Sequence, residues 1–331
     1  MIYQVVALSA IAATASAGLA SAPAESVKLM FENFKKVHGK RYATMTEESN
    51  RYANFVKNLA VIDARNADEK KANGSAQHGI TRFADMSQEE FAQKYLTYTT
   101  DDAEKANAKV ATVAPYTGSS DAQDWTSIYT TPVKDQGYCG SCWAFAASEQ
   151  IESDAMRELG VTYLLSQQQL VECDKTSLGC NGGLQERAYN YVKRAGGIEL
   201  DSDYPYTSGA DGSADTCSSD KNKFVLTVSG YETIKSGESA MASYIKSTGP
   251  LSIAIDASTW STYTGGIMST CGHDINHAVQ LVGVDTGAGY WKVRNSWSAT
   301  WGEEGFIRLA YGQDTCGITY DVTYTTGVSK V

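Results

Sequence analysis

The sequence predicts an α+β protein in which helices come before strands along the chain. Apolar residues recur at helical spacing in the segments 143–159 and 166–173, and from residue 224 onward short apolar runs bounded by turn residues dominate. Helices and strands that are separated in this way favour a domain of two packed lobes. With 331 residues, of which 42% are hydrophobic and 20% charged, the chain can bury one large core or two modest ones.

The first expected helix carries an unusual stripe of residues spaced three and four apart. The stripe places polar Arg and Asn among apolar positions, which indicates a specific docking surface rather than a plain amphipathic helix. Its members are Glu47, Arg51, Phe55, Asn58, Ile62 and Asn66.

Two further helices and five strands follow. Gly160 is a typical stop for the helix that ends at Leu159, and Ser166 is placed to cap the helix that runs to Cys173. The expected strands are FVLTVSGY at 224–231, LSIAI at 251–255, AVQLVGV at 278–284, YWKVRNSW at 290–297 and GFIRLAYG at 305–312.

Charge and hydropathy exclude several classes of function. The chain has 28 basic and 38 acidic residues, a net charge of −10, which argues against a nucleic-acid partner. No internal stretch approaches the roughly 20 apolar residues of a membrane-spanning helix. Residues 18–113 hold 14 basic and 13 acidic side chains, whereas residues 114–331 hold 14 and 25. The chain therefore divides into a nearly neutral first part and an acidic second part.

The first 17 residues resemble a secretory signal peptide. They are uncharged, contain the apolar run Val5–Ala13, and end in the small residues Ala15-Ser16-Ala17. A buried N-terminal helix is the alternative. We expect a cut near Ala17 and a route through the secretory pathway to a lysosome-like vacuole or to the extracellular space, without a membrane anchor once the signal is removed. Asp101–Ala114 is expected to be an exposed linker, the kind of segment that proteases cut.

Seven cysteines, all after residue 138, make disulfides possible in that compartment. Because seven is odd, at least one thiol stays unpaired. Cys142 stands where a Gly- and Ser-containing turn opens a helix, and the partial positive charge of a helix N-terminus favours a thiolate. His277 immediately precedes an apolar strand and could carry a proton. Asn295 follows another strand and could orient the imidazole.

These residues resemble the signature of the papain-like cysteine proteases. Cys139-Gly-Ser-Cys142-Trp143 matches in full, and His277 and Asn295 follow Cys142 by 135 and 153 residues. The stripe in the first helix matches the inhibitory propeptide of the cathepsin L-like branch, as do Gly79, Phe83 and Asp85, although Thr81 stands where Asn is usual. The resemblance thus implies a precursor made of a signal peptide (1–17), a helical I29-like propeptide (18–113) and a mature peptidase domain (114–331).

The resemblance implies a helical left lobe and an antiparallel, barrel-like right lobe with the active-site cleft between them. Cys142 would attack the scissile carbonyl as a thiolate paired with the imidazolium of His277, which Asn295 holds and Trp297 shields from water. Gln136 would donate to the oxyanion beside the backbone N–H of Cys142. The enzyme would be a cysteine endopeptidase made as a zymogen.

The resemblance also implies disulfides, which leave Cys142 free, and a set of substrate-binding residues. The disulfides are Cys139–Cys180, Cys173–Cys217 and Cys271–Cys316. Gly182 and Gly183 would pair with an extended substrate, and Leu184, Ala254 and Ile275 would line the pocket for the second residue before the scissile bond. This pocket would accept Phe or Leu. Asp321 would stand near its floor and let it accept Arg or Lys as well, unless the short carboxylate points to solvent.

In the cathepsin B-like branch of the family an occluding loop closes one end of the cleft, and it would lie between Cys173 and Cys180 or just after. The sequence has no room for it there, so the resemblance implies a cleft that is open at both ends. The expected partners are peptide and protein substrates, the chain's own propeptide and cystatin-type inhibitors, and the expected oligomeric state is a monomer. No cofactor and no metal are expected.

Two other functions compete with this interpretation. Cys139 and Cys142 form a Cys-x-x-Cys pair, as in thiol–disulfide oxidoreductases, but that function leaves five cysteines unexplained. An inactive binding or storage homologue is the other alternative. Two local questions also stay open, namely whether Asn73 is glycosylated and whether Ser298, where the family has Gly, is strained by a positive φ.

Overall fold

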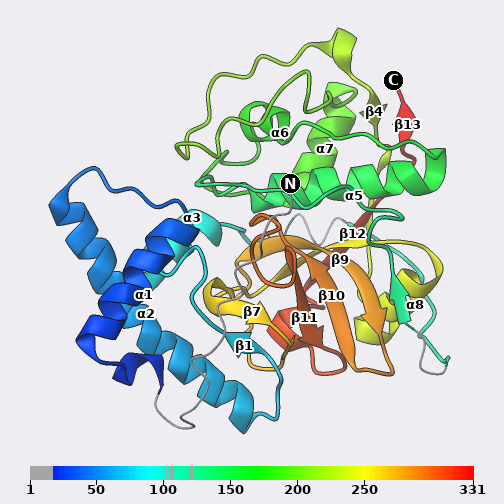
Figure 1. Ribbon diagram of the computed structural model, residues 1–331. Coiled ribbons are helices and arrows are strands. Elements are labelled where there is room, and N and C mark those ends of the chain that lie inside the picture. Colours follow the sequence, from blue (N-terminus) through cyan, green and yellow to red (C-terminus); the bar gives the residue numbers. More distant parts are fainter. Residues whose placement is uncertain (1–17, 102, 104–107, 119–121) are drawn as a thin grey trace, which may run out of the picture.

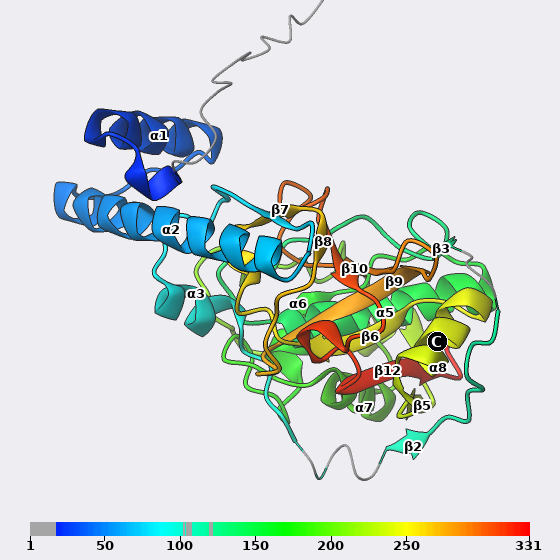
Figure 2. The same ribbon diagram turned by 90° about the horizontal axis from the view of Figure 1, so that it is seen from below.

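The computed structural model describes residues 18–101, 103, 108–118 and 122–331, so the predicted signal peptide lies outside the described residues. Within these limits the chain forms a helical N-terminal region and two lobes, one helical and one built on a large sheet (Figures 1 and 2). Each of the three contains a buried apolar cluster, and the cluster of the sheet lobe also includes Phe83 and Phe91 of the N-terminal region. The predicted α+β class is confirmed.

The N-terminal region is built on two crossing helices, α1 (Ala24–Val37) and α2 (Met45–Lys71). Phe31 and Phe34 of α1 pack on Phe55 of α2, with ring centroids 5.3 Å apart in both pairs. A 3-10 turn (Leu19–Ser21) precedes α1, while strand β1 (Gln77–His78) and helix α3 (Gln88–Tyr95) follow α2.

All six residues of the predicted stripe lie on α2, and its polar members bind backbone or charge within the N-terminal region. The Asn58 side chain donates to the carbonyls of Ala84 (2.8 Å) and Met86 (2.7 Å). Arg51 pairs with Glu90 at 2.5 Å. The docking surface therefore holds the segment that leads into α3.

The helical lobe contains α5 (Cys142–Leu159), α6 (Gln167–Cys173) and α7 (Gln185–Ala195). Gly160 ends α5 in the left-handed region, at φ 66°. Ser166 caps α6 by accepting from the N–H of Gln169 at 2.9 Å. The pair β4 (Leu226–Thr227) and β13 (Ser329–Lys330) also lies beside this lobe, so the C-terminus returns to it (Figure 1).

The sheet lobe is a largely antiparallel sheet in the order β2-β5-β12-β6-β9-β10-β11-β8, with β3 paired to the far end of β9. Helix α8 (Gly237–Ser247) covers it from one side and α5 packs on β9, β12 and β6. Its strands are β2 (Lys109–Val110), β3 (Ala122–Asp124), β5 (Gly230–Thr233), β6 (Leu251–Ile255), β8 (Ile267–Met268), β9 (His277–Asp285), β10 (Tyr290–Arg294), β11 (Phe306–Ala310) and β12 (Asp321–Thr326). A separate strand β7 (Tyr263–Gly265) pairs with β1 of the N-terminal region. Short 3-10 turns occupy Lys221–Lys223, Trp260–Thr262 and Thr315–Gly317.

Three expectations from the sequence need correction. The single strand expected at 224–231 is two strands, because the chain passes there from the helical lobe (β4) to the sheet lobe (β5). The strand expected at 290–297 ends at Arg294. The linker is not exposed throughout, since Lys109–Val110 pairs with the open edge of β5 and Ala111 is buried. Helices α7 and α8 have no counterpart among the expected elements.

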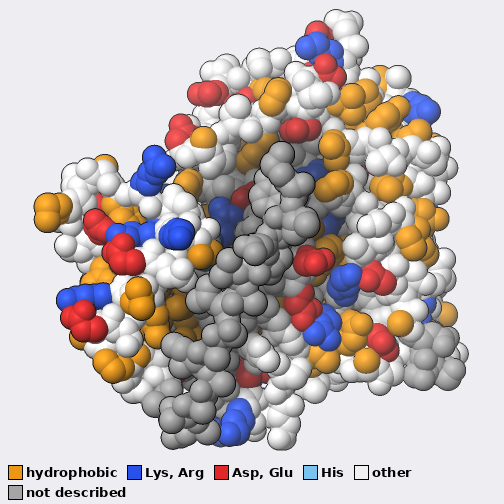
Figure 3. Space-filling model, in the orientation of Figure 1, with side chains coloured by type: hydrophobic (Ala, Val, Ile, Leu, Met, Phe, Trp, Pro, Cys, Tyr) orange, Lys and Arg blue, Asp and Glu red, His pale blue; other side chains and the backbone are white. Residues whose placement is uncertain are grey.

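No helix among the described residues is both long and apolar enough to cross a membrane. On the face shown in Figure 3, acidic and basic side chains are interspersed and do not gather into one patch of a single sign.

Candidate active site

Cys142 is the first residue of α5, and the loop before it is held from several sides. Cys139 is bonded to Cys180, and the N–H of Gly140 donates to the Cys180 carbonyl at 3.0 Å. The N-cap residue Ser141 makes no side-chain hydrogen bond to the first turn; its hydroxyl instead bonds to that of Tyr206 at 2.8 Å. The first N–H groups of α5 therefore keep their capacity to bind a negative charge.

The structure forms the disulfides Cys139–Cys180, Cys173–Cys217 and Cys271–Cys316. Cys142, which is buried, is the one cysteine of the described chain outside a disulfide.

His277 and Asn295 meet at the end of the sheet that faces α5. His277 begins β9 and Asn295 follows β10, the neighbouring strand, so the ladder itself brings them together. His277 Nε2 lies 2.9 Å from Asn295 Oδ1, which also accepts the N–H of Ser296 at 2.8 Å. The amide oxygen therefore faces the ring, Nε2 carries the proton, and Nδ1 is the nitrogen left for chemistry. Trp297 stacks on the ring with centroids 4.8 Å apart.

Gln136 is oriented by two donors that hold its carbonyl oxygen. The hydroxyl of Ser296 donates to Gln136 Oε1 at 2.7 Å and the indole of Trp297 at 3.2 Å. Its Nε2 consequently points the other way, toward the turn before α5, and donates to the carbonyl of Cys139 at 3.0 Å.

Burial keeps the thiol and the imidazole neutral in this form of the protein. It raises the pKa of the Cys142 thiol, while hydrogen bonds from the backbone of Ala278 and from Thr97 act in the opposite direction. Burial likewise lowers the pKa of His277 to about 4, against the effect of the Asn295 hydrogen bond. Both shifts have the same cause, namely the cover that other parts of the chain form over the two groups.

The cover is the segment that follows α3, which runs between the two lobes. Thr97 Oγ1 donates to the carbonyl of Gly140 at 2.8 Å, and the N–H of Tyr98 donates to the carbonyl of Asn276 at 3.0 Å. Tyr98 pairs with Gly183 in parallel. Gly182 has φ 119°, and a Cβ there would lie 2.1 Å from the Thr97 carbonyl, so only glycine permits this approach.

The side chain of Tyr98 fills the pocket predicted for substrate. It packs in one buried cluster with Cys142, Ala146, Leu184, Ala254, Ile275 and Ala278. Its hydroxyl donates to Oδ2 of Asp321, the buried first residue of β12. The alternative that Asp321 points to solvent is therefore wrong for this form of the chain.

Sequence reasoning missed Tyr98 and Thr97, because no periodicity or motif distinguishes them within YLTYTT. Ser298, by contrast, does adopt the positive φ that the family's Gly at this position suggests, with a value of 71°. Thr81, where the propeptide pattern usually has Asn, donates through its hydroxyl to the carbonyl of Ser261 in the sheet lobe. The described residues contain no cluster of three or more His, Cys, Asp or Glu side chains that could hold a metal ion.

Comparison with known proteins agrees with this geometry. The papain family of cysteine proteases matches residues 117–326, and the cathepsin propeptide inhibitor domain (I29) matches residues 31–91. The chain belongs to the papain family of cysteine proteases. It carries its inhibitory propeptide domain attached, as the zymogen of a cysteine endopeptidase does.

Relatives of this protease are cathepsin L-like. It is 38% identical to cysteine proteinase 2 of Leishmania pifanoi over 321 residues, covering 90% of this chain and 70% of the relative. It is 39% identical to cathepsin L 1 of Paramecium tetraurelia, in an alignment that covers 87% of this chain and 89% of that relative. The structure of digestive procathepsin L 3 from the larval midgut of Tenebrio molitor superposes with a TM-score of 0.79 at 32% identity, covering 91% of this chain and 99% of that one.

Proposed function

We propose that Cys142, His277, Asn295 and Gln136 are the catalytic residues of this protease. One observation carries the proposal. Cys142, the one free thiol of the described chain, contacts the backbone of Ala278, which is the neighbour of His277 in sequence. Asn295 holds the ring of that His277. Nδ1, the nitrogen that Asn295 leaves available, is the proton carrier for a thiol on that side.

Catalysis proceeds through an acyl-enzyme. The Cys142 thiolate attacks the scissile carbonyl and the imidazolium of His277 gives its proton to the leaving amine. Water then releases the acyl group with His277 as base. The amide N–H of Gln136 and the backbone N–H of Cys142 stabilise the oxyanion, and such a donor is typically worth about 2.7–4 kcal/mol of barrier.

The zymogen consists of a signal peptide (1–17), a propeptide (18–113) and the mature enzyme (114–331), with the activating cut between residues 101 and 120. Latency has two causes: Tyr98 occupies the substrate pocket, and the covered catalytic pair stays neutral. Removal of the propeptide reverses both.

Specificity resides in the pocket that Tyr98 now fills. Gly182 and Gly183 pair with the substrate backbone, and Leu184, Ala254 and Ile275 accept Phe or Leu as the second residue before the scissile bond. Asp321 at the floor also accepts Arg or Lys, since it already binds a polar hydrogen there.

The enzyme acts in an oxidising compartment as a monomer, with cystatin-type proteins as its inhibitors. Three disulfides and cathepsin L-like relatives are the properties of secretory or lysosomal proteins. A lysosome-like vacuole and the extracellular space both fit.

The decisive experiment is acid activation of residues 18–331 at about pH 4.5 with reductant. We expect a loss of roughly 100 residues together with hydrolysis of a Phe-Arg fluorogenic peptide, and neither in the Cys142→Ala variant. Processing without hydrolysis would establish an inactive homologue, and reduction of insulin without peptide cleavage an oxidoreductase. In the same assay, an Asp321→Ala enzyme should lose turnover of an Arg-Arg peptide selectively. Equal turnover would remove Asp321 from the pocket's specificity.

A further inference from the structure

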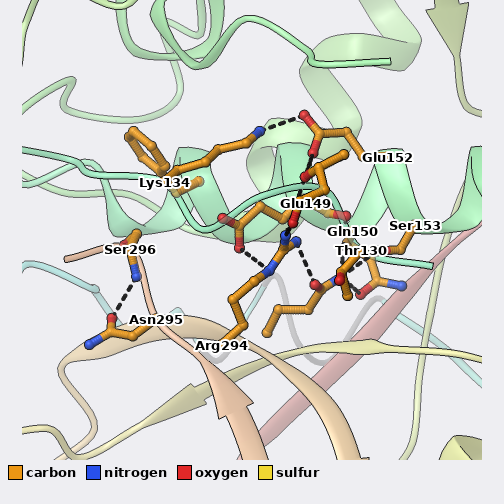
Figure 4. A network of polar contacts seen from close by, with 12 residues as sticks. Thr130, Lys134, Glu149, Gln150, Glu152, Ser153, Arg294, Asn295 and Ser296 are labelled. Carbon is orange, nitrogen blue, oxygen red and sulfur yellow. Dashed lines mark hydrogen bonds and ion pairs between the residues drawn. The ribbon is translucent and has the colours of Figure 1, made fainter. Parts of the chain in front are cut away.

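Arg294 lies fully buried beneath the proposed catalytic groups and immediately precedes Asn295. Its Nη1 donates to the carbonyl of Thr131 at 2.6 Å and its Nη2 to Oε1 of Gln280 at 2.6 Å. Its Nε faces Oε2 of Glu149 at 3.4 Å (Figure 4). Three separate segments of the chain therefore hold one guanidinium.

Glu149 stands on α5, two turns after Cys142, and is 1% exposed. Its backbone carbonyl accepts from Nε2 of Gln280 at 3.2 Å, so both ends of the residue face the sheet. The charged groups around it are Arg294, Lys134 and Glu152. Burial raises the pKa of the Glu149 carboxyl, and the two cations oppose that shift.

A second ion pair lies beside Arg294 and Glu149, and the two pairs with their hydrogen-bond partners form one polar network. Nζ of Lys134 lies 2.5 Å from Oε1 of Glu152, one helical turn after Glu149, and the hydroxyl of Thr131 donates to the other oxygen of Glu152 at 2.5 Å. Both pairs join α5 to the segment 131–136 or to the sheet (Figure 4).

Each segment with a proposed catalytic residue also contributes a nearby residue to this network. Lys134 is two residues before Gln136, Gln280 three after His277, and Arg294 one before Asn295; Glu149 follows Cys142 by seven. The network thus lies where α5 of the helical lobe meets the sheet lobe.

Stability alone does not account for such an arrangement. Apolar residues of similar volume often replace a buried ion pair at no cost in stability, because the pair loses its hydration. Catalysis, however, depends steeply on geometry, and a misplacement of about 1 Å can cost on the order of 100-fold in rate. Here the reacting thiol and its imidazole come from different lobes.

We propose that Glu149 and Arg294 form a positioning pair that fixes Asn295, and through it the His277 ring, relative to Cys142 at the start of α5. This rests on the catalytic roles proposed above. Neither residue touches substrate. The pair acts on the distance and angle between imidazole and thiol.

The test uses the full-length proform of four variants, Glu149→Gln, Arg294→Met, Arg294→Lys and the double variant Glu149→Gln/Arg294→Met, processed where necessary by an added aspartic protease that is then blocked. Glu172→Gln is the matched control, since Glu172 is a buried helical carboxylate of the same lobe that binds Gln168 at 2.7 Å instead. The readouts are Tm, kcat and KM, and the pH dependence of Cys142 alkylation by iodoacetamide.

The double variant separates positioning from stability. We expect its Tm to return close to that of the wild type, whereas kcat stays reduced by about tenfold or more with KM changed less than about twofold. Alkylation should need a pH higher by about one unit or more, because a displaced imidazolium stabilises the thiolate less. Arg294→Lys should recover part of kcat, and Glu172→Gln should alter Tm alone.

A double variant with wild-type Tm, kcat and alkylation profile would overturn the positioning pair. Failure of all four variants to fold would overturn it too and make the pair a requirement for folding. Neither result touches the proposed function, which fails only if the wild-type enzyme is inactive or Cys142→Ala retains activity.

Discussion

This zymogen has two internal seams, one where the helical lobe packs on the sheet lobe and one where the propeptide packs on the enzyme. Their ion pairs differ in exposure to solvent. At the seam between the lobes, Arg294, Glu149 and Glu152 are buried and Lys134 is 13% exposed. At the seam between propeptide and enzyme, ion pairs such as Arg82–Asp135 lie at the rim, where both side chains are partly exposed. Exposed pairs contribute little to stability, so the ion pairs at the second seam do little to hold the propeptide in place.

Beside the aromatic contacts of Phe83 and Phe91 with Trp297, two charged side chains of α2 bind uncharged partners of the sheet lobe. Glu69 of α2 accepts the N–H groups of Ser269 (3.0 Å) and Thr270 (2.7 Å), and Arg65 donates to the hydroxyl of Thr262 at 2.8 Å. His78 also bonds to that hydroxyl. Of these groups, His78 has a lowered pKa in the docked propeptide, so its protonation can couple docking to pH.

The largest effect is expected from Tyr98, which closes the propeptide seam at the substrate pocket. Tyr98→Ala removes a buried aromatic side chain, a loss of about 3 kcal/mol by analogy with core substitutions. In a Cys142→Ala background, mature enzyme added in trans should therefore cut the propeptide about 100-fold faster, because cleavage follows the open population. Tyr98→Phe loses only the hydrogen bond to Asp321, so cleavage of its propeptide should be about tenfold faster than in the proform with Tyr98. Unchanged rates would mean that the seam is closed elsewhere.

His78 should make the opening of this seam depend on pH. Burial and the nearby Arg65 lower its pKa to about 4 in the docked propeptide, against about 6.5 when free. Docking is thus at full strength above pH 6.5 and weakens by up to about tenfold per pH unit as the pH falls toward 4.

The measurement is the rate of cleavage in trans of Cys142→Ala proforms with and without His78→Gln, taken as a ratio at each pH so that the cutting enzyme cancels. The rate of the proform that keeps His78, divided by the rate of the His78→Gln proform, should rise as the pH falls from about 6.5 to about 4. His273→Gln, on an exposed loop, is the control. A ratio that does not vary with pH would remove His78 from the acid response.

The smallest effect is expected where the two seams meet. Ser298 holds φ 71° while its N–H donates to the carbonyl of Lys134 at 3.0 Å, and Arg82 of the propeptide contacts the carbonyl of Trp297 beside it. Ser298→Gly relieves the left-handed strain but adds freedom to the unfolded chain, so we expect a gain of less than about 1 kcal/mol.

A thermal unfolding curve of the Cys142→Ala proform should show this gain as a Tm higher by a few degrees at most, with the cleavage rate in trans unchanged. A clear loss of Tm would show that the Ser298 hydroxyl bond to Thr300 at 3.2 Å matters more than the strain.

What depends on neighbours along the chain could be predicted from the sequence. The start of α5 at its turn, its stop at Gly160, the Ser166 cap and strand 251–255 all agree with the structure, since caps and periodicity are local properties. The chemistry of a thiol at a helix start and the expected meeting of His277 with Asn295 followed from residue types and a family signature.

The tertiary structure alone decided which distant groups meet. Residues 142–155 of α5 are all buried, including the polar Glu149 and Glu152, which a periodic pattern would place in solvent. The pairing of 109–110 with β5 and the docking of Tyr98 against Asp321 likewise have no local signal. Such contacts join segments far apart in sequence, and their partners are set by the packing of whole elements, which no window along the chain contains.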